Sequence, residues 1–182
     1  MKILPILTAT LLSSLGFAYS ASPTLNLILP RGGQLGTDVN LEFSGERLED
    51  AEEICSATPE IKVTAFKVVD KTKVSGTIHI EPNCPLGEHL LRIRAKSGLT
   101  YARTFWVGQF PSVDEKEPNT QLDKAQEVAL GSTMQGTIEN EDVDYYKFTA
   151  KKGERISAEL EGIRLAGANM DAYIGILDSK RF

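Results

Sequence analysis

The chain has 182 residues, of which 41% are hydrophobic and 25% are charged, and its formal net charge is −5. This composition is typical of a globular protein and argues against disorder, and the length suits two small domains or one large one. An acidic chain without a basic stripe offers nucleic acid little electrostatic attraction, so we expect no nucleic-acid partner. Cations are the better candidate ligands.

The first twenty residues have the pattern of a cleaved signal peptide. Lys2 precedes an apolar run that reaches Phe17, and Ala18 and Ser20 place small residues at the −3 and −1 positions of a cleavage site. We therefore expect residues 1–20 to be removed and the protein to be exported to the periplasm, the cell surface or the medium. An uncleaved anchor is the alternative. No later stretch reaches the roughly 20 apolar residues of a membrane span, so we predict no span once the signal is removed.

Residues 21–108 are predicted to form an antiparallel β-sandwich. Apolar and polar residues alternate at 39–43 and again at 74–80, and β-rich runs follow at 89–94 and 104–107. Turn signals rich in glycine and proline lie between these runs, and no long amphipathic helix pattern is present. The expected fold class is therefore all-β.

A glycine-bearing segment, Arg31–Thr37, invites comparison with a phosphate-binding loop. It lacks the Lys-Ser/Thr ending of such a loop, and a strand pattern follows it instead of a helix, so it predicts a turn between strands. Together with Asn40–Gly45 and Gly87–Arg94, it resembles the immunoglobulin-like, IPT/TIG-type domains of large exported bacterial proteins. The resemblance covers about half of the chain and implies an immunoglobulin-like domain.

Cys55 and Cys84 are the two cysteines of the chain. An oxidising compartment favours a disulfide between them, which would stabilise a small sandwich by roughly 3 to 4 kcal/mol in the loop-entropy model. The alternative is a pair of free or buried thiols.

Catalytic motifs are weak in this sequence. His79 and His89 are the two histidines, neither belongs to a His-Glu-x-x-His motif, and no Gly-x-Ser-x-Gly motif is present. Cys84 with either histidine is a nominal thiol nucleophile pair, but ordinary sheet histidines and a structural cysteine are the better interpretation. We predict no catalytic residue and no enzyme activity in this chain, although a catalytic domain outside it stays possible.

The composition changes after Val107. Residues 109–120 combine Pro111 and Pro118 with several acidic side chains and are predicted to be an acidic linker. Residues 121–182 are predicted to form a second β-module. Its predicted strands are residues 133–138, 145–148, 155–160 and 171–177.

An ordered series of short motifs runs through this second half. It consists of Glu115-Lys116-Glu117-Pro118-Asn119, Ala125, Gly131, Gly136, Asp142-Val143-Asp144-Tyr145-Tyr146-Lys147-Phe148 and Gly153. In order and spacing the series resembles the bacterial pre-peptidase C-terminal domain, a family related to the collagen-binding domains of clostridial collagenases. The resemblance covers the chain from Glu115 onward and implies a small jelly-roll-like β-sandwich with an accessory role.

Two acidic motifs supply the candidate metal ligands. Carboxylate and amide oxygens suit calcium, which takes six to eight oxygen ligands. Two-residue spacing places side chains on one side of an extended segment, and Pro118 favours extension at the residue before it. The calcium sites of the related collagen-binding domains imply that both segments hold one ion, whereas the alternative is a solvated linker with an Asp-rich turn. The candidate ligands are Glu115, Glu117, Asn119, Asp142 and Asp144.

The last predicted strand ends at Leu177, although the family fold normally needs further strands after it. We therefore expect the chain to be a fragment whose second module is truncated. The preferred function is a noncatalytic exported binding, targeting or spacer protein with a calcium-stabilised module. The alternatives are the N-terminal accessory region of a larger secreted peptidase and a structural envelope or matrix component. The expected partner is an extracellular polymer or protein, whose identity the sequence does not give.

Overall fold

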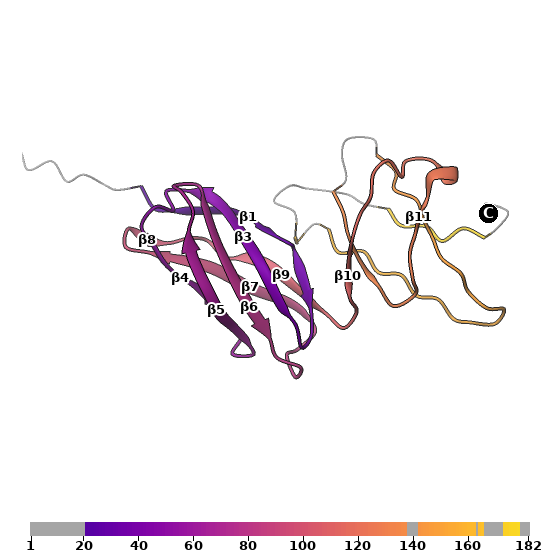
Figure 1. The fold of residues 1–182 in the computed structure, drawn as a ribbon, viewed down its shortest axis with the longest axis horizontal. Helices are drawn as coiled ribbons and strands as arrows, with labels where there is room; N and C mark the ends of the chain where they lie inside the picture. Colours follow the sequence, from indigo (N-terminus) through magenta and orange to yellow (C-terminus); the bar gives the residue numbers. More distant parts are fainter. Residues whose placement is uncertain (1–20, 138–141, 163, 166–172, 179–182) are drawn as a thin grey trace, which may run out of the picture.

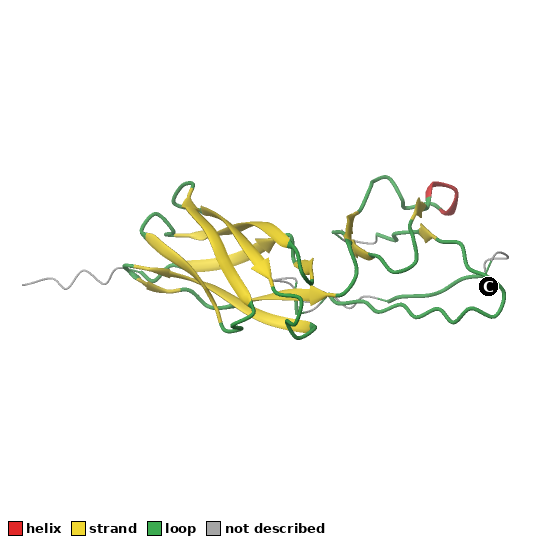
Figure 2. Ribbon diagram, turned by 60° about the horizontal axis from the view of Figure 1, so that its bottom comes forward, coloured by secondary structure: helices red, strands yellow, loops and turns green. Residues whose placement is uncertain are grey.

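The computed structural model describes residues 21–137, 142–162, 164–165 and 173–178. The predicted signal peptide lies outside these ranges. Strands are concentrated in residues 21–108, here called the first module, whereas the described part of residues 109–178, here called the second module, consists largely of loops (Figures 1 and 2). In the part of the chain that the structure describes, the regular elements are strands apart from one short 3-10 helix, η1 (Leu122–Lys124), which confirms the predicted all-β class. Within the described ranges, no helix has the length and apolar content needed to cross a membrane.

The first module is a sandwich of two sheets, with strand orders β1-β3-β6-β5 and β2-β9-β7-β4. The immunoglobulin fold places its first, second, fifth and fourth strands in one sheet and its third, sixth and seventh strands in the other. The first module has this order when β1 and β2 are counted as two halves of the first strand and the short β8 is left out. The immunoglobulin-like prediction is thus confirmed by topology. The strands are β1 (Thr24–Leu29), β2 (Gly32–Gln34), β3 (Asp38–Glu46), β4 (Ala51–Ser56), β5 (Ile61–Val68), β6 (Lys73–Ile80), β7 (Gly87–Ala95), β8 (Gly98–Leu99) and β9 (Arg103–Gly108).

The core of the first module lies between the two sheets. Strand β6 buries every second residue, because successive side chains of a strand point to opposite faces. Phe43 on β3 and Phe105 on β9 are fully buried and belong to opposite sheets, so they fill the space between them. Each such burial stabilises the fold by about 1.5 to 3 kcal/mol.

The strongest strand patterns in the sequence are found as strands. The runs at 39–43, 74–80, 89–94 and 104–107 lie within β3, β6, β7 and β9. The glycine-bearing segment contains the predicted turn, at Leu35 and Gly36 before β3, and also a strand, because Gly32–Gln34 forms β2 and pairs with β9 in parallel. A Cβ at Gly32 would lie 2.5 Å from the main-chain oxygen of Trp106, so this close pairing requires glycine.

The predicted disulfide is wrong for this structure, in which Cys55 and Cys84 are both free. Cys55 follows Ile54 on β4, and since Ile54 is buried in the core, the next side chain points to the outer face of the sheet. The Cys55 thiol lies 3.4 Å from Glu53 Oε1 on that face. Cys84 instead packs within the core. The alternation of the strand therefore places the two thiols on different sides of the sheet.

We expect the unreduced, unfolded chain to titrate two thiols with an aromatic disulfide reagent. In the native protein Cys55 should react before Cys84, which is only 4% exposed. Burial raises the pKa of both thiols, so both reactions should be slow at neutral pH. In the Cys55→Ser variant only the slower of the two reactions, that of Cys84, should remain. Absence of free thiol in the unreduced wild-type chain would contradict this arrangement.

The second module contains short strands that pair in two parallel ladders, β10 with β12 and β11 with β13. Of the four strands predicted here, residues 133–138 and 145–148 correspond to β12 and β13. Residues 155–160 and the described part of 171–177 form no strand, because they have no ladder partner within the described ranges. The strands are β10 (Ser112–Asp114), β11 (Gln126–Glu127), β12 (Thr133–Gln135) and β13 (Tyr146–Lys147).

The acidic segment 109–120 is built into the second module. Its residues 112–114 are β10, which lies beside β12, and Glu115 donates its main-chain amide to Gln135 O at 2.9 Å. Only residues 109–111 separate β9 from β10. Side chains also join the modules, because Gln135 Nε2 donates to Gly32 O at 3.4 Å and Arg164 forms an ion pair with Glu88 at 2.6 Å.

Candidate metal centre

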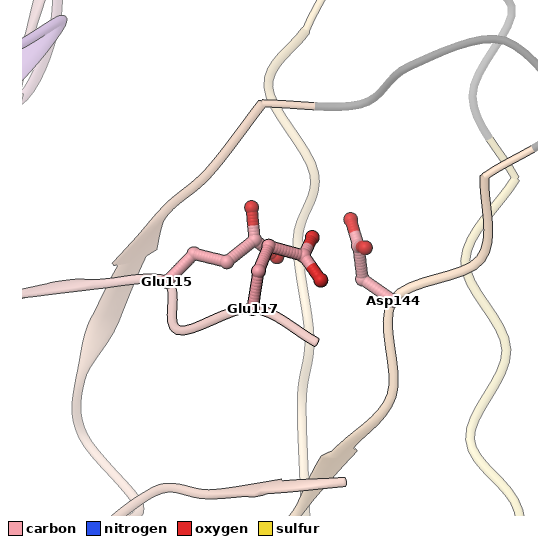
Figure 3. Close-up of side chains that lie close together, drawn as sticks. All are labelled: Glu115, Glu117 and Asp144. Atoms are coloured by element: carbon pink, nitrogen blue, oxygen red, sulfur yellow. The ribbon is translucent and has the colours of Figure 1, made fainter. Parts of the chain in front are cut away.

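Three carboxylates converge where the chain leaves β10 and where it enters β13. Glu115 and Glu117 follow β10, and Asp144 lies two residues before β13. One oxygen of each lies within 4.8 Å of an oxygen of the others. Figure 3 shows the side chains pointing toward one another from two separate segments of the chain. The structure thus brings Asp144 beside two acidic groups that precede it by 27 and 29 residues in the sequence.

Main-chain hydrogen bonds hold the two segments side by side. The amide of Tyr145 donates to Asn119 O at 3.0 Å, and the amide of Gln126 donates to Tyr145 O at 2.9 Å. The β11–β13 ladder continues this contact, pairing Gln126 with Tyr146. Asp144 is therefore held opposite the Glu115–Asn119 segment by its neighbours.

Glu115 is the most strongly hydrogen-bonded of the three acids. Its carboxylate accepts bonds from Asn119 Nδ2 at 2.9 Å, from the Tyr146 hydroxyl at 2.5 Å and from the Thr137 amide at 3.0 Å. Burial opposes ionisation, but these donors outweigh it and lower the pKa of Glu115. Burial and the hydrogen bond to Glu115 raise the pKa of Tyr146 in turn. The ionised carboxylate of Glu115 therefore connects three segments of the module, which contain Asn119, Thr137 and Tyr146.

Asn119 is the buried polar residue of this cluster, with no exposed surface. Its main-chain amide donates to Glu117 Oε2 at 3.0 Å and its side-chain amide donates to Glu115. Its Oδ1 is buried without a hydrogen-bond partner, as is Oδ1 of Asp144. Buried oxygen atoms without partners are costly. A cation at the three-carboxylate cluster would supply the partner that Asp144 Oδ1 lacks.

Asp144 carries the largest electrostatic cost in the cluster. Burial, and then repulsion by Glu115 and other neighbouring carboxylates, raise its pKa from 3.8 to about 6. The same proximity that makes the ionised form of Asp144 unfavourable makes the cluster attractive to a cation.

In metal-free protein, we expect the second module to become more stable as the pH falls from 7 to 5. The folded state binds a proton at Asp144 near pH 6, whereas the unfolded chain does so only near pH 4, so the free energy of unfolding rises as the pH falls through 6 and levels off only below about pH 4. The lowered pKa of Glu115 acts in the opposite direction only below about pH 4.5. Urea unfolding in chelator, followed through the amide resonances of β10 and β12, measures this change. The Asp144→Asn variant should lack the rise, and a wild-type module that loses stability over the same interval would contradict the assignment.

Four of the five predicted ligands gather at this centre, and Asp142 does not join the three-carboxylate cluster. The prediction assumed that Asp142 and Asp144 lie on one strand, but β13 begins only at Tyr146. Oδ1 of Asp142 instead accepts a hydrogen bond from the amide of Val143 at 2.9 Å. Asp142 still contributes to raising the pKa of Asp144, so it acts on the centre through its charge.

Sequence reasoning missed the donors that orient Glu115. The Tyr146 hydroxyl donates to Glu115, and the two-residue spacing of Tyr146 from Asp144 was the available signal. The donor of Thr137 is its main-chain amide. Since almost every residue has such an amide, the identity of this residue gave no signal.

The donor set suits a hard divalent cation. It offers three carboxylates and an amide, all with oxygen ligands, and contains no thiolate or imidazole. Calcium accepts irregular oxygen coordination completed by water, whereas zinc and copper favour nitrogen and sulfur. Glu115, Glu117, Asn119 and Asp144 are therefore the residues that fit a calcium ion.

The nominal Cys84–His89 pair has a different geometry from a nucleophile and its base. His89 is 5% exposed, and Nε2, which lies 3.9 Å from the Cys84 sulfur, is 2.8 Å from Pro85 O. A carbonyl oxygen only accepts hydrogen bonds, so Nε2 carries a proton and Nδ1 accepts from the Thr58 hydroxyl at 2.6 Å. In this tautomer the nitrogen nearest the thiol is a donor, and His89 links a loop to β7.

Comparison with known proteins gives no family for the chain. No protein-family model and no curated protein matches it. Among solved structures, it is similar to the crystal structure of the Lin-41 filamin domain, with 11% sequence identity and a TM-score of 0.35. That match covers 49% of this chain and 99% of the other. Likeness at this level assigns neither a family nor a function.

Proposed function

We propose that the chain is an exported, noncatalytic binding, targeting or spacer protein whose second module is stabilised by calcium. The observation that carries the proposal is the convergence of Glu115, Glu117 and Asp144 beside Asn119, whose buried side-chain amide donates to Glu115. The chemistry of these oxygen donors fits calcium, and the resemblance to the pre-peptidase C-terminal domain supports an accessory role.

Calcium would stabilise the second module by joining two chain segments that are otherwise connected by few contacts. Its ladders span only two or three residues each, and no apolar side chain after Val107 is buried in the described ranges. Glu115 and Glu117 belong to the segment after β10, and Asp144 to the segment before β13. An ion shared between them links these segments and relieves the repulsion among the three carboxylates.

Calorimetric titration of chelator-treated protein with calcium tests the proposal. We expect one ion per chain with a dissociation constant on the order of 10⁻⁴ to 10⁻³ M, the range of extracellular calcium modules. At a free calcium concentration ten times that constant, the bound state is stabilised by about 1.4 kcal/mol. Amide resonances of β10–β13 should shift on titration while those of β3 and β6 stay fixed. Absence of both calcium heat and these shifts at millimolar calcium would falsify the calcium proposal.

The binding role and the peptidase-accessory role predict different partners. A glycan and matrix-protein array probed with the mature chain in calcium should show retention on an extracellular polymer if the chain is a binding or targeting module. Uniform absence of binding favours a spacer or structural role. An accessory role in a secreted peptidase requires a catalytic domain in the same gene product, which the intact mass of the native protein and its peptide sequence would reveal.

A further inference from the structure

Gly136 lies directly against the carboxylate of Glu115. A Cβ at position 136 would lie 2.4 Å from Oε2, 2.8 Å from Cδ and 3.1 Å from Oε1, and real Cβ atoms essentially never make contacts under 3.0 Å. The backbone itself does not demand glycine here, since Gly136 is absent from the glycines with positive φ. The residue is also exposed, so a methyl group would not enter a core. The three atoms nearest to such a Cβ therefore all belong to the Glu115 carboxyl group.

The close approach serves the hydrogen bond that follows it in the chain. The amide of Thr137 donates to Glu115 Oε2 at 3.0 Å, and this requires the backbone at 136 to pass beside the carboxylate. An alanine would push away the free end of the Glu115 side chain rather than a rigid backbone group. The displaced carboxylate would leave its donors Tyr146 and Asn119.

We propose that Gly136 is a positioning residue of the cation centre, because it leaves the space in which Glu115 meets its three donors and faces Asp144. This inference rests on the proposed function for the identity of the ion, calcium. It adds a specific requirement, namely that position 136 controls ion affinity through Glu115 and leaves the first module unchanged.

A double-mutant cycle between positions 136 and 115 tests this coupling in the intact chain. Gly136→Ala should weaken calcium binding by about 10- to 100-fold, as is typical for groups that orient a ligand. Glu115→Asp shortens the side chain by one methylene and withdraws the carboxylate, so adding Gly136→Ala to it should cost less than about twofold further. Gly108→Ala is the matched control, because a Cβ there meets nothing closer than Thr133 Oγ1 at 3.6 Å. Wild-type affinity in Gly136→Ala, or an equal loss in both backgrounds, overturns the proposal.

A metal-free measurement separates this proposal from the calcium proposal. In chelator, Gly136→Ala should shift the side-chain amide resonances of Asn119, which donates to Glu115, whereas Gly108→Ala should not. Resonances of β3 and β6 should match the wild type in both variants. If wild-type protein binds no calcium, the proposed function fails and this shift alone decides the role of Gly136. Unchanged Asn119 resonances then overturn it.

Discussion

Asp144→Asn is expected to weaken calcium binding by about 100-fold or more and to remove the calcium-induced rise in stability. The substitution keeps the size of the side chain but removes one of three ligand charges, and lost ligands cost more than the 10- to 100-fold of their supporting groups. In chelator the same variant should be more stable than the wild type at pH 7, since it removes a buried charge whose pKa is raised to about 6. Calcium titration and urea unfolding with and without chelator measure both effects. The variant should thus lose stability relative to the wild type in calcium and gain stability in chelator. This pair of opposite changes distinguishes a calcium ligand from a residue that only supports the fold.

Asp142→Asn is the matched control for this variant. It is the same chemical change two residues away, at an acid outside the three-carboxylate cluster. We expect it to weaken calcium binding by less than about threefold, because Asp142 contributes charge to the centre but no oxygen to the three-carboxylate cluster. An equal loss of affinity in both variants would show that net charge, and not the geometry of the cluster, attracts calcium.

Phe43→Ala is expected to destabilise the first module by about 3 to 5 kcal/mol, the cost of removing a large buried aromatic side chain. Phe43 has no exposed surface, lies on β3 at the centre of its sheet order and belongs to the core cluster. Since a small domain has only about 5 to 15 kcal/mol in total, this loss should leave a substantial unfolded population at 37 °C. Urea unfolding monitored by Trp106 fluorescence gives the free energy directly.

Tyr101→Ala is the control for the core substitution. Tyr101 is also aromatic but is 85% exposed, so its loss should change the free energy of unfolding by less than about 0.5 kcal/mol. A similar cost for Phe43→Ala and Tyr101→Ala would contradict the position of the core between the two sheets.

The sequence pattern predicted those strands whose burial alternates. Leu41 and Phe43 on β3 are buried, whereas Asn40 and Glu42 point outward. The alternation of apolar and polar residues in the sequence therefore matches the two-residue period of the strand. Strand β5 has no such pattern, because it lies at the edge of its sheet and exposes residues on both faces, including Val63. Its position depends on pairing with β6, a contact that local sequence does not encode.

The candidate centre was predictable to the extent that its ligands repeat at short spacing. Glu115, Glu117 and Asn119 were found because they alternate in an extended segment, and the structure places all three together. Asp142 was included through a strand that in fact begins at Tyr146. The role of Gly136 depends on a third segment, so only the folded chain reveals it.

The parallel pairing of β2 with β9 determines how the first module would carry mechanical load. A force applied to the two ends of this module would pull β2 toward the N-terminus and β9 toward the C-terminus. Because β2 and β9 are parallel neighbours, the two forces act in opposite directions along the ladder between them. The ladder from Gly32–Trp106 to Gln34–Gly108 is then loaded in shear, so its hydrogen bonds must break together and not one after another. Extended by the bonds from Trp106 to Arg31 O and from Leu35 to Gly108 O, this short ladder would be the force-bearing element of a spacer under tension.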